Sequence, residues 1–541
     1  MIIIRYSICL GLLVLTACSP APSTSPAPAA APEKQNVLFI IVDDLKPLLG
    51  AYGADQIISP NIDALAASGT LFTNAHAQQA ICAASRMSFM TGMRPDRTRI
   101  WDLQTKMRDE NPNALTLPEY FKQNEYQTVG LGKVMHGAKN NDAQSWTMDF
   151  VNDTDLTYPE GYEMPANGFY QGEELLKGYQ KNEEEQSASH LNDDWFAVNA
   201  RLKAANLRPS VEMADVPDDA YTDGAAARKT VELMEGFRQK KQPFMVTIGF
   251  KKPHLPFVAP TKYWELYQRE NIQLASHQGA AEGAPAFAYH NNGELKNYSD
   301  ITPHLDESGR VDDDKQRELI HGYYACVSYI DAQIGLLTDY LKESGLDKNT
   351  AIVLVGDHGW HLGDHGLWNK HSNFEQATRT PLIFSAPGLP AGQRNDSPVE
   401  LVDIFPTICD LASLAQTEDL QGKSLLPILE GRESRVKPAA LSQYPRNCNV
   451  VAKAMPQYPD ACDIMGYAVR DERYRYVAWY QGSYTDRDNF NVDAIVAEEL
   501  YDYKNDPLET ISVVDQAQYA DAKAVLRKFL AQNIFSVSQT E

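Results

Sequence analysis

Two short apolar runs of the sequence end in polar residues that could bind a metal ion. The first run is followed by Asp43 and Asp44, and the second by Asp357 and His358. If both runs are parallel strands of one sheet, three carboxylates meet at one edge and cannot all stay ionised without a cation. Carboxylate oxygens suit hard divalent ions, so the sequence predicts a divalent metal site. Either pair alone fits a helix cap or a turn equally well.

A cysteine and an arginine four residues apart form a second motif. Residues 82–86 read Cys-Ala-Ala-Ser-Arg, and residues 91–95 read Thr-Gly-Met-Arg-Pro. Five residues alone would fit a structural cysteine beside a salt-bridging arginine. Lysine and histidine also recur in three local settings, which contain Lys133 with His136, then His254 in Lys-Pro-His-Leu-Pro-Phe, and Lys370 in Trp-Asn-Lys.

In combination these motifs resemble the type I, formylglycine-dependent sulfatases, and most closely the iduronate-2-sulfatase-like polysaccharide sulfatases. In that family a cysteine followed by x, Pro or Ala, x and Arg is oxidised to formylglycine, and the helix after it ends in Thr-Gly. Ala84 stands where many members have proline, which leaves the maturation enzyme of Cys82 open. The resemblance runs from about residue 36 to residue 509, through the segments 252–257, 324–331, 357–370, 399–407 and 499–509.

The resemblance implies an alkaline-phosphatase-like fold and hydrolysis of sulfate esters. Cys82 would become formylglycine (3-oxoalanine), and a formylglycine-generating or radical maturation enzyme would be a partner. One Ca²⁺ per chain would be held by Asp43, Asp44, Asp357, His358 and the modified Cys82.

The resemblance also implies roles for the basic residues. Lys133 and Lys370 would bind sulfate oxygens, and Arg86 would orient the modified cysteine. A hydroxyl of the hydrated aldehyde would attack sulfur while His254 protonates the leaving alcohol. His136 would then deprotonate the second hydroxyl, so that sulfate is released.

The elements that must position these residues follow from hydrophobic periodicity. Helical patterns lie between short apolar runs, the clearest of them over residues 317–341. Strands alternating with helices predict an α/β domain with a large, mostly parallel central sheet flanked by helices. Short strands at 467–470 and 474–479 and a helix at 517–532 predict a smaller α+β subdomain with an antiparallel sheet. The apolar runs read as buried strands are 36–42, 127–132, 244–250, 351–356 and 382–385.

The N-terminus predicts export. Arg5 and an apolar stretch precede Leu-Thr-Ala-Cys, which resembles the box of bacterial lipoproteins, although an ordinary signal peptide cut nearby is the alternative. We expect a signal peptide at 1–17, a lipidated Cys18 and a Pro/Ala/Ser-rich tether over 18–35. The protein would then face the periplasm or the cell surface and touch the membrane only through its lipid.

We expect a catalytic domain over 36–430, with an acidic surface insertion over 143–223, and a C-terminal subdomain over 431–541. Cys448 and Cys462 bracket a short loop and could form a disulfide.

The charge balance limits the partners. With 49 Lys plus Arg against 72 Asp plus Glu, the formal charge is −23, which argues against a nucleic-acid binder. An anionic substrate must therefore meet a local reversal of charge. We expect sulfated oligosaccharides of a polysaccharide, either algal, such as ulvan, or a glycosaminoglycan. The alternatives are a phosphatase or phosphonate monoester hydrolase of the same superfamily, and a non-catalytic glycan-binding lipoprotein.

Overall fold

The computed structural model describes residues 34–137, 141–186, 195–447, 463–482, 484–485 and 494–534. The predicted signal peptide, the lipidated Cys18 and almost all of the tether lie outside these residues. So do Cys448 and Cys462 with their predicted disulfide. Within the described ranges, each helix is too short or too polar to cross a membrane.

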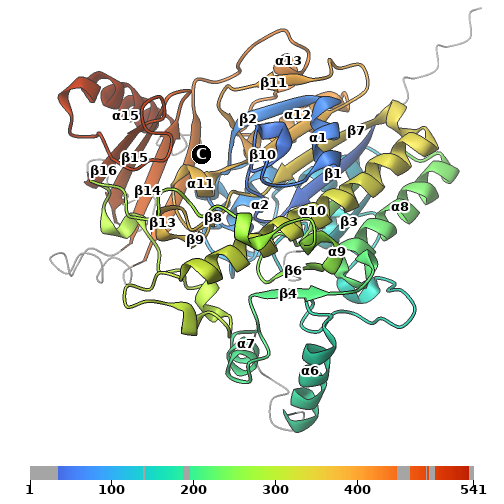
Figure 1. The fold of residues 1–541 in the computed structure, drawn as a ribbon. Helices are drawn as coiled ribbons and strands as arrows, with labels where there is room; N and C mark the ends of the chain where they lie inside the picture. The colour runs from blue at the N-terminus through green and yellow to red at the C-terminus, as the bar shows by residue number, and fades with distance from the viewer. Residues whose placement is uncertain are drawn as a thin grey trace, which may run out of the picture. The chain divides into compact units, whose positions relative to one another are not determined.

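Residues 35–541 form one compact unit, and its largest sheet has eight strands (Figure 1). Its strand order is β11-β2-β10-β7-β1-β5-β3, with β12 also paired to β2. The strands β7, β1, β5 and β3 are parallel neighbours, which confirms the predicted mostly parallel sheet. The bounds are β1 (Asn36–Val42), β2 (Thr70–His76), β3 (Gln127–Gly132), β5 (Phe244–Phe250), β7 (Thr350–Gly356), β10 (Arg379–Ser385), β11 (Gln393–Asn395) and β12 (Val399–Glu400).

All five apolar runs are strands of this sheet, but β10 differs from the other four in direction. It is antiparallel to both of its neighbours, β7 and β2. Its carboxyl end therefore lies at the opposite edge from the polar residues that follow β1 and β7. Burial explains the shared apolar pattern, because a central strand is covered on both faces whichever way it runs.

Helices cover both faces of the sheet, as alternate residues of β1 show. Leu38, Ile40 and Val42 belong to a core shared with α1, α8 and α10. Val37, Phe39 and Ile41 belong to a second core, shared with α2, α5 and α12. Both faces of β1 are thus buried, as expected of a parallel strand. These helices are α1 (Pro60–Ala67), α2 (Cys82–Thr91), α5 (Leu117–Gln123), α8 (Thr222–Lys240), α10 (Asp313–Ser344) and α12 (Ile404–Leu411).

A four-stranded antiparallel sheet, in the order β13-β14-β15-β16, forms the C-terminal part, as predicted. The predicted last helix is α15 (Ala520–Ile534), which packs on this sheet. The boundary between residues 430 and 431 stays a prediction. The strands are β13 (Ala440–Arg446), β14 (Ile464–Arg470), β15 (Tyr474–Gln481) and β16 (Ile495–Asp502).

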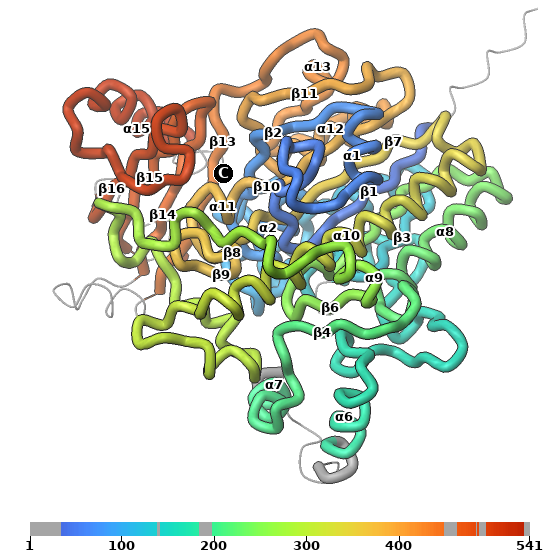
Figure 2. Tube along the Cα trace, viewed as in Figure 1, coloured from blue at the N-terminus to red at the C-terminus, as the bar shows by residue number. Residues whose placement is uncertain are grey.

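The stretch expected to be an insertion carries two helices that extend away from the central sheet (Figure 2). They are α6 (Glu173–Gln186) and α7 (Trp195–Ala204), and β4 (Val211–Ala214) follows them. β4 pairs with β6 (Phe257–Pro260), the strand directly after the predicted His254 motif. Strand pairing therefore connects the stretch expected to be an insertion to the segment that carries His254.

The remaining elements are short. They include the hairpin of β8 (His361–Leu362) and β9 (Trp368–Asn369). The short helices are α3 (Pro95–Thr98), α4 (Met107–Glu110), α9 (Thr261–Trp264), α11 (Glu375–Thr378) and α13 (Leu426–Leu429).

Candidate active site

Strand register brings four polar segments to one edge of the sheet. Val42, the last residue of β1, lies opposite Gly356 of β7 and Phe250 of β5. Gly249 of β5 in turn lies opposite Gly132 of β3. The chain leaves all four parallel strands at nearly the same level, so the residues that follow them meet there. These are Asp43 and Asp44, Asp357 and His358, His254, and Lys133 with His136.

Glycines make the close approach between β3 and β5 possible. Gly132 has φ +66°, a left-handed conformation that turns the chain sharply after β3. A Cβ atom on Gly249 would lie 1.9 Å from the carbonyl oxygen of Lys133. Only a residue without a side chain therefore lets the Lys133 segment cross over β5.

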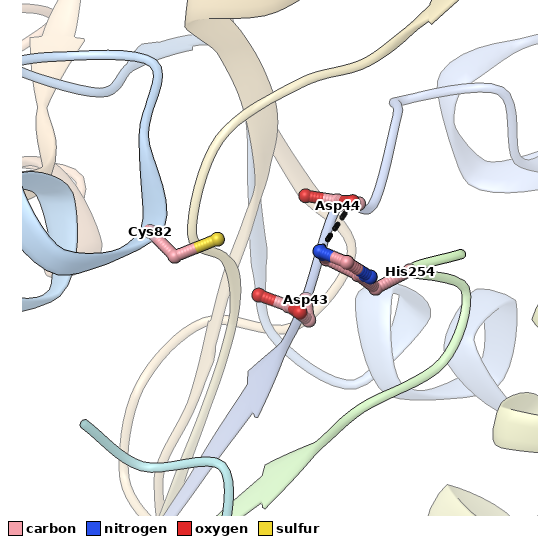
Figure 3. Close-up of side chains that lie close together, drawn as sticks. All are labelled: Asp43, Asp44, Cys82 and His254. Carbon is pink, nitrogen blue, oxygen red and sulfur yellow. Dashed lines mark ion pairs between the residues drawn. The ribbon is translucent and has the colours of Figure 1, made fainter. Parts of the chain in front are cut away.

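Cys82 and Lys370 reach the same edge by other routes. Cys82 begins α2, and its sulfur points towards Asp43 and Asp44 (Figure 3). Its Sγ lies 3.7 Å from Nζ of Lys133. Lys370 follows β9, and its Nζ lies 3.1 Å from each carboxylate oxygen of Asp44.

The predicted metal ligands, together with His254, form two overlapping groups, and within each group the ligand atoms lie within 4.8 Å of one another. Cys82 belongs to both groups. Nε2 of His358 is fully buried, has no hydrogen-bond partner among the described residues and lies 3.5 Å from Asp357 Oδ2. Oxygen-rich donors with an unpartnered imidazole nitrogen fit a divalent cation. One group is Asp43, Asp44, Cys82 and His254, and the other is Cys82, Asp357 and His358.

Arg86 connects the carboxylates of two strands. Its buried guanidinium donates to Asp43 and to Asp357, each at 2.8 Å, and to the carbonyls of Lys133 and Val134. Its hydrogen bonds thus fix the ends of β1, β7 and β3 relative to one another.

The two adjacent aspartates have pKa values shifted in opposite directions. Burial opposes ionisation of Asp43, but Lys133 and Arg86 outweigh it and hold the pKa of Asp43 well below its usual range. Burial raises the pKa of Asp44 well above its usual range, although Lys370 opposes this effect. The two neighbouring carboxylates therefore differ in how readily they ionise.

The two predicted acid–base histidines lie among these charges. Nδ1 of His254 is 2.6 Å from the carbonyl oxygen of Leu255, which can only accept, so this nitrogen carries hydrogen. Nε2 of His254 faces Asp44 at 3.8 Å. Burial and then the charge of Lys370 lower the pKa of His254 to about 4. Burial and then Lys133 lower the pKa of His136 to about 3.

Three further residues border this cluster and were not expected from the sequence. Glu294 lies 3.0 Å from His254 Nε2 and 3.2 Å from Lys370 Nζ. His371 contacts Glu294 with Nε2 and the hydroxyl of Tyr444 with Nδ1. Glu294 lies in a loop reading His-Asn-Asn-Gly-Glu, where no periodic pattern or motif marks it. Only folding brings Glu294 next to Lys370 and His371, which lie 76 and 77 residues later in the chain.

Buried groups of the C-terminal sheet support the segment after Lys370. Arg475 of β15 donates to Glu509 at 2.5 Å and to the carbonyl of Asn373. Glu509 also accepts from the backbone N–H of Glu375 at 3.0 Å. The glutamate at the end of the C-terminal motif therefore holds the chain that follows the lysine.

A similar support fixes the turn that carries His254. The buried ammonium of Lys252 donates to the carbonyls of His254 and Pro256, at 2.5 and 2.7 Å. The carboxylate of Asp223 accepts from the backbone N–H groups of Lys251 and Lys252. All predicted site residues except Cys18, which lies outside the described residues, thus gather at one edge of the sheet.

Comparison with known proteins gives this geometry a family. The sulfatase family profile matches residues 35–414, and the profile of the N-sulphoglucosamine sulphohydrolase C-terminal region matches residues 363–535. Human iduronate 2-sulfatase is 34% identical over 95% of this chain and 96% of its own length. A sulfatase of Formosa agariphila is 30% identical over 92% of this chain and 86% of its own length.

The fold is shared with solved structures of lower identity. The phosphonate monoester hydrolase from Silicibacter pomeroyi superposes with a TM-score of 0.66 at 21% identity, over 92% of this chain and 95% of that chain. The family match covers most of the chain and includes the whole cluster at the sheet edge. The chain therefore belongs to the sulfatase family and is a sulfuric ester hydrolase.

Proposed function

We propose that this sulfatase removes sulfate from sulfated carbohydrate, namely oligosaccharides of an algal polysaccharide such as ulvan or of a glycosaminoglycan. The observation that carries the proposal is the position of Cys82, beside Lys133 and a group of carboxylates suited to a cation. Similarity to iduronate 2-sulfatase over nearly the whole chain supports a sulfated sugar as the substrate class.

Two groups would complete the site. We propose that Cys82 is converted to formylglycine, which supplies the nucleophile as a hydroxyl of its hydrate. When bound, a Ca²⁺ ion supplies positive charge beside the nucleophile and the sulfate. Asp43, Asp44, Asp357 and His358 would hold this ion, because their side chains are buried, both groups of ligand atoms include Cys82, and Nδ1 of His358 lies 3.5 Å from Asp44.

The two lysines would bind the transferred group. Nζ of Lys133 lies beside Cys82, and Nζ of Lys370 lies against Asp44. Ammonium groups placed around the sulfur would neutralise the sulfate oxygens and stabilise charge that develops as the ester bond breaks. Arg86 is hydrogen-bonded to carboxylates and carbonyls in the described structure, so we propose that it keeps the strand ends in register around Cys82.

The histidines would transfer protons. Nδ1 of His254 is held by a backbone carbonyl, so Nε2 faces the site and is the atom from which the leaving oxygen would take its proton. We propose that His136, three residues after Lys133, accepts the proton that must leave the nucleophile side before sulfate is released. Two imidazoles, each on the loop after a different strand, would thus serve the two proton transfers.

Defined sulfated oligosaccharides test the substrate class. Incubation with ulvan and glycosaminoglycan fragments should release inorganic sulfate from one position of a sugar, identified by mass spectrometry. Mass spectrometry of the Cys82 peptide tests for formylglycine directly. In a host whose maturation enzyme accepts only cysteine, Cys82→Ser should lose turnover. Sulfate release by that variant, with no aldehyde present, would contradict the proposed nucleophile.

Paired aryl esters test the alternatives. The protein should hydrolyse an aryl sulfate in preference to the matching aryl phosphate, and a preference for phosphate would favour a phosphatase or phosphonate monoester hydrolase. Binding of sulfated oligosaccharides without any turnover would favour the non-catalytic glycan-binding alternative, against which the full set of lysines, histidines and carboxylates argues.

We also propose that the protein is an exported lipoprotein, anchored through Cys18. The sequence Leu-Thr-Ala-Cys and the Pro-rich segment after it support this proposal. Cys18→Ala should move the protein from the membrane fraction to the soluble fraction of the host. Retention in the membrane fraction would argue against the anchor.

A further inference from the structure

We infer that Glu294 is a positioning residue that sets the orientation of the His254 imidazole for protonation of the leaving group. The inference rests on the proposed role of His254 as the acid. Glu294 is one of the side chains that border the cluster of site residues without belonging to any motif of the sequence. It would act through His254 and not by contact with the sulfur.

Glu294 joins three basic side chains of the site. One carboxylate oxygen lies 3.0 Å from Nε2 of His254 and 3.2 Å from Nζ of Lys370. The other lies 3.2 Å from Nε2 of His371. The side chain is 22% exposed, so the carboxylate lies at the border between the buried cluster and solvent. Because Nδ1 of His254 donates to Leu255, Nε2 donates to Glu294 only when the ring is an imidazolium, which is the form that can protonate a leaving group.

The loop that carries Glu294 is itself held from two directions. Asn292 donates to the carbonyl of Gly366 and accepts from the backbone N–H of Trp368, which ties the loop to the β8–β9 hairpin. On the other side, Lys203 of α7 donates to the carbonyl of Lys296 at 2.5 Å. A group fixed by both the hairpin and the insertion can orient a neighbour with little freedom.

The other contacts of the three donors predict which one depends most on Glu294. Lys370 keeps both carboxylate oxygens of Asp44 at 3.1 Å, and His371 keeps the hydroxyl of Tyr444 at 2.8 Å. His254 keeps the carbonyl of Leu255 at 2.6 Å through Nδ1, but for its Nε2 the next carboxylate is Asp44 at 3.8 Å, beyond hydrogen-bond distance. Loss of the Glu294 carboxylate would therefore remove the one contact within hydrogen-bond distance that the described structure gives Nε2 of His254, whereas Nζ of Lys370 would keep two.

This asymmetry predicts a dependence on the leaving group. A misplaced acid slows an ester whose leaving group needs a proton and has little effect on one whose leaving group is stable as an anion. A displaced lysine would slow both esters, because both carry the same sulfate. A misplaced His254 and a displaced Lys370 can therefore be told apart with one pair of substrates.

The probes are phenyl sulfate and 4-nitrophenyl sulfate, used with the full-length protein after formylglycine has been verified. For Glu294→Gln we expect kcat/KM on phenyl sulfate to fall roughly 10- to 100-fold, the usual effect of removing an orienting partner. On 4-nitrophenyl sulfate we expect a fall of no more than about threefold. Glu307→Gln, on an exposed loop, is the matched control and should change neither value.

Calcium titration supplies a readout that is independent of turnover. Glu294→Gln should bind Ca²⁺ as the unaltered protein does, because the carboxylate is not among the groups that fit the ion. Weakened Ca²⁺ binding, an equal fall on both esters, or no fall on either would overturn the inference.

His254→Ala separates the inference from the function on which it rests. We expect this variant to lose phenyl sulfate hydrolysis selectively. If it slows both esters equally, the acid role of His254 is wrong and the inference fails with it. If only Glu294→Gln lacks the selectivity, the role of His254 stands and the inference alone is wrong.

Discussion

Replacing Glu400 by glutamine should destabilise the protein at the far end of the helix that begins with Cys82. Glu400 ends β12 and is 2% exposed. It accepts from Nη2 of Arg94 at 2.7 and 2.8 Å and from Nζ of Lys437 at 2.6 Å. Arg94 lies two residues after Gly92, the C-cap of α2. The ion pair of Arg94 and Glu400 thus anchors the C-terminal end of α2 to β12, the strand that begins the 399–407 segment.

Two routes give the size of the effect. Removing one partner of a buried ion pair costs roughly 3–5 kcal/mol, because the remaining charge is left uncompensated. Burial raises the pKa of Glu400, but Arg94 and Lys437 outweigh it and lower this pKa from 4.5 to about 2. That interval corresponds to roughly 3 kcal/mol. Lys437 keeps Asp403 at 2.6 Å, so we expect the lower value, about 3 kcal/mol.

The same pKa fixes the dependence on pH. A carboxylate whose pKa is lowered by folding stabilises the protein fully above its unfolded value near 4.5, and this contribution is lost as the pH falls towards 2. The difference in unfolding free energy between the unaltered protein and Glu400→Gln should therefore be constant at neutral pH and shrink below pH 4.5.

Urea unfolding followed by tryptophan fluorescence measures this difference. Glu430→Gln is the control, because Glu430 pairs with Arg432 where both side chains are exposed, and such pairs contribute at most about 1 kcal/mol. If Glu400→Gln costs no more than this control at neutral pH, the network does not anchor the helix as we argue.

Three other changes have definite expected outcomes. Gly249→Ala should displace the Lys133 backbone and reduce turnover of any sulfate ester, whereas Gly236→Ala, where a Cβ meets nothing within 4 Å, should leave turnover unchanged in the same assay. Chelation by EDTA should lower the thermal midpoint and added Ca²⁺ should restore it, because an ion at a hundred times its Kd stabilises the folded protein by about 2.7 kcal/mol. In Asp357→Asn the response of the midpoint to Ca²⁺ should be weakened, and a full response would argue against Asp357 as a ligand. Arg475→Met should lower the unfolding free energy by roughly 3–5 kcal/mol in urea, because a buried carboxylate loses its cation; an unchanged urea midpoint would refute that support.

Much of the fold could be predicted because local burial leaves a local pattern. The strand over 36–42 is buried at every position and apolar from Val37 onward, since both of its faces are covered. The direction of β10 could not be predicted, because a buried strand has the same composition whichever way it runs. Its neighbours in the sheet come from distant parts of the chain, and only their pairing sets its direction.

The candidate site divides in the same way. Residues such as Asp43 and Asp357 directly follow strands, so chain order and the rule for parallel sheets were enough to bring them together. Glu294 belongs to an irregular loop and reaches His254 through contacts of the β8–β9 hairpin and of α7. No periodicity describes such a loop, so sequence reasoning missed it.

By itself, the sequence determined the chemical types at the site and the four strand ends that present them, because side chains that follow buried strands are fixed by short-range pattern. Tertiary structure alone decided the partners of those groups. Arg86 joins Asp43 to Asp357, which are more than three hundred residues apart. Arg94 forms an ion pair with Glu400, which lies 306 residues later in the chain. Such pairs form where strand register and helix packing bring distant segments together, and that geometry has no trace in local sequence.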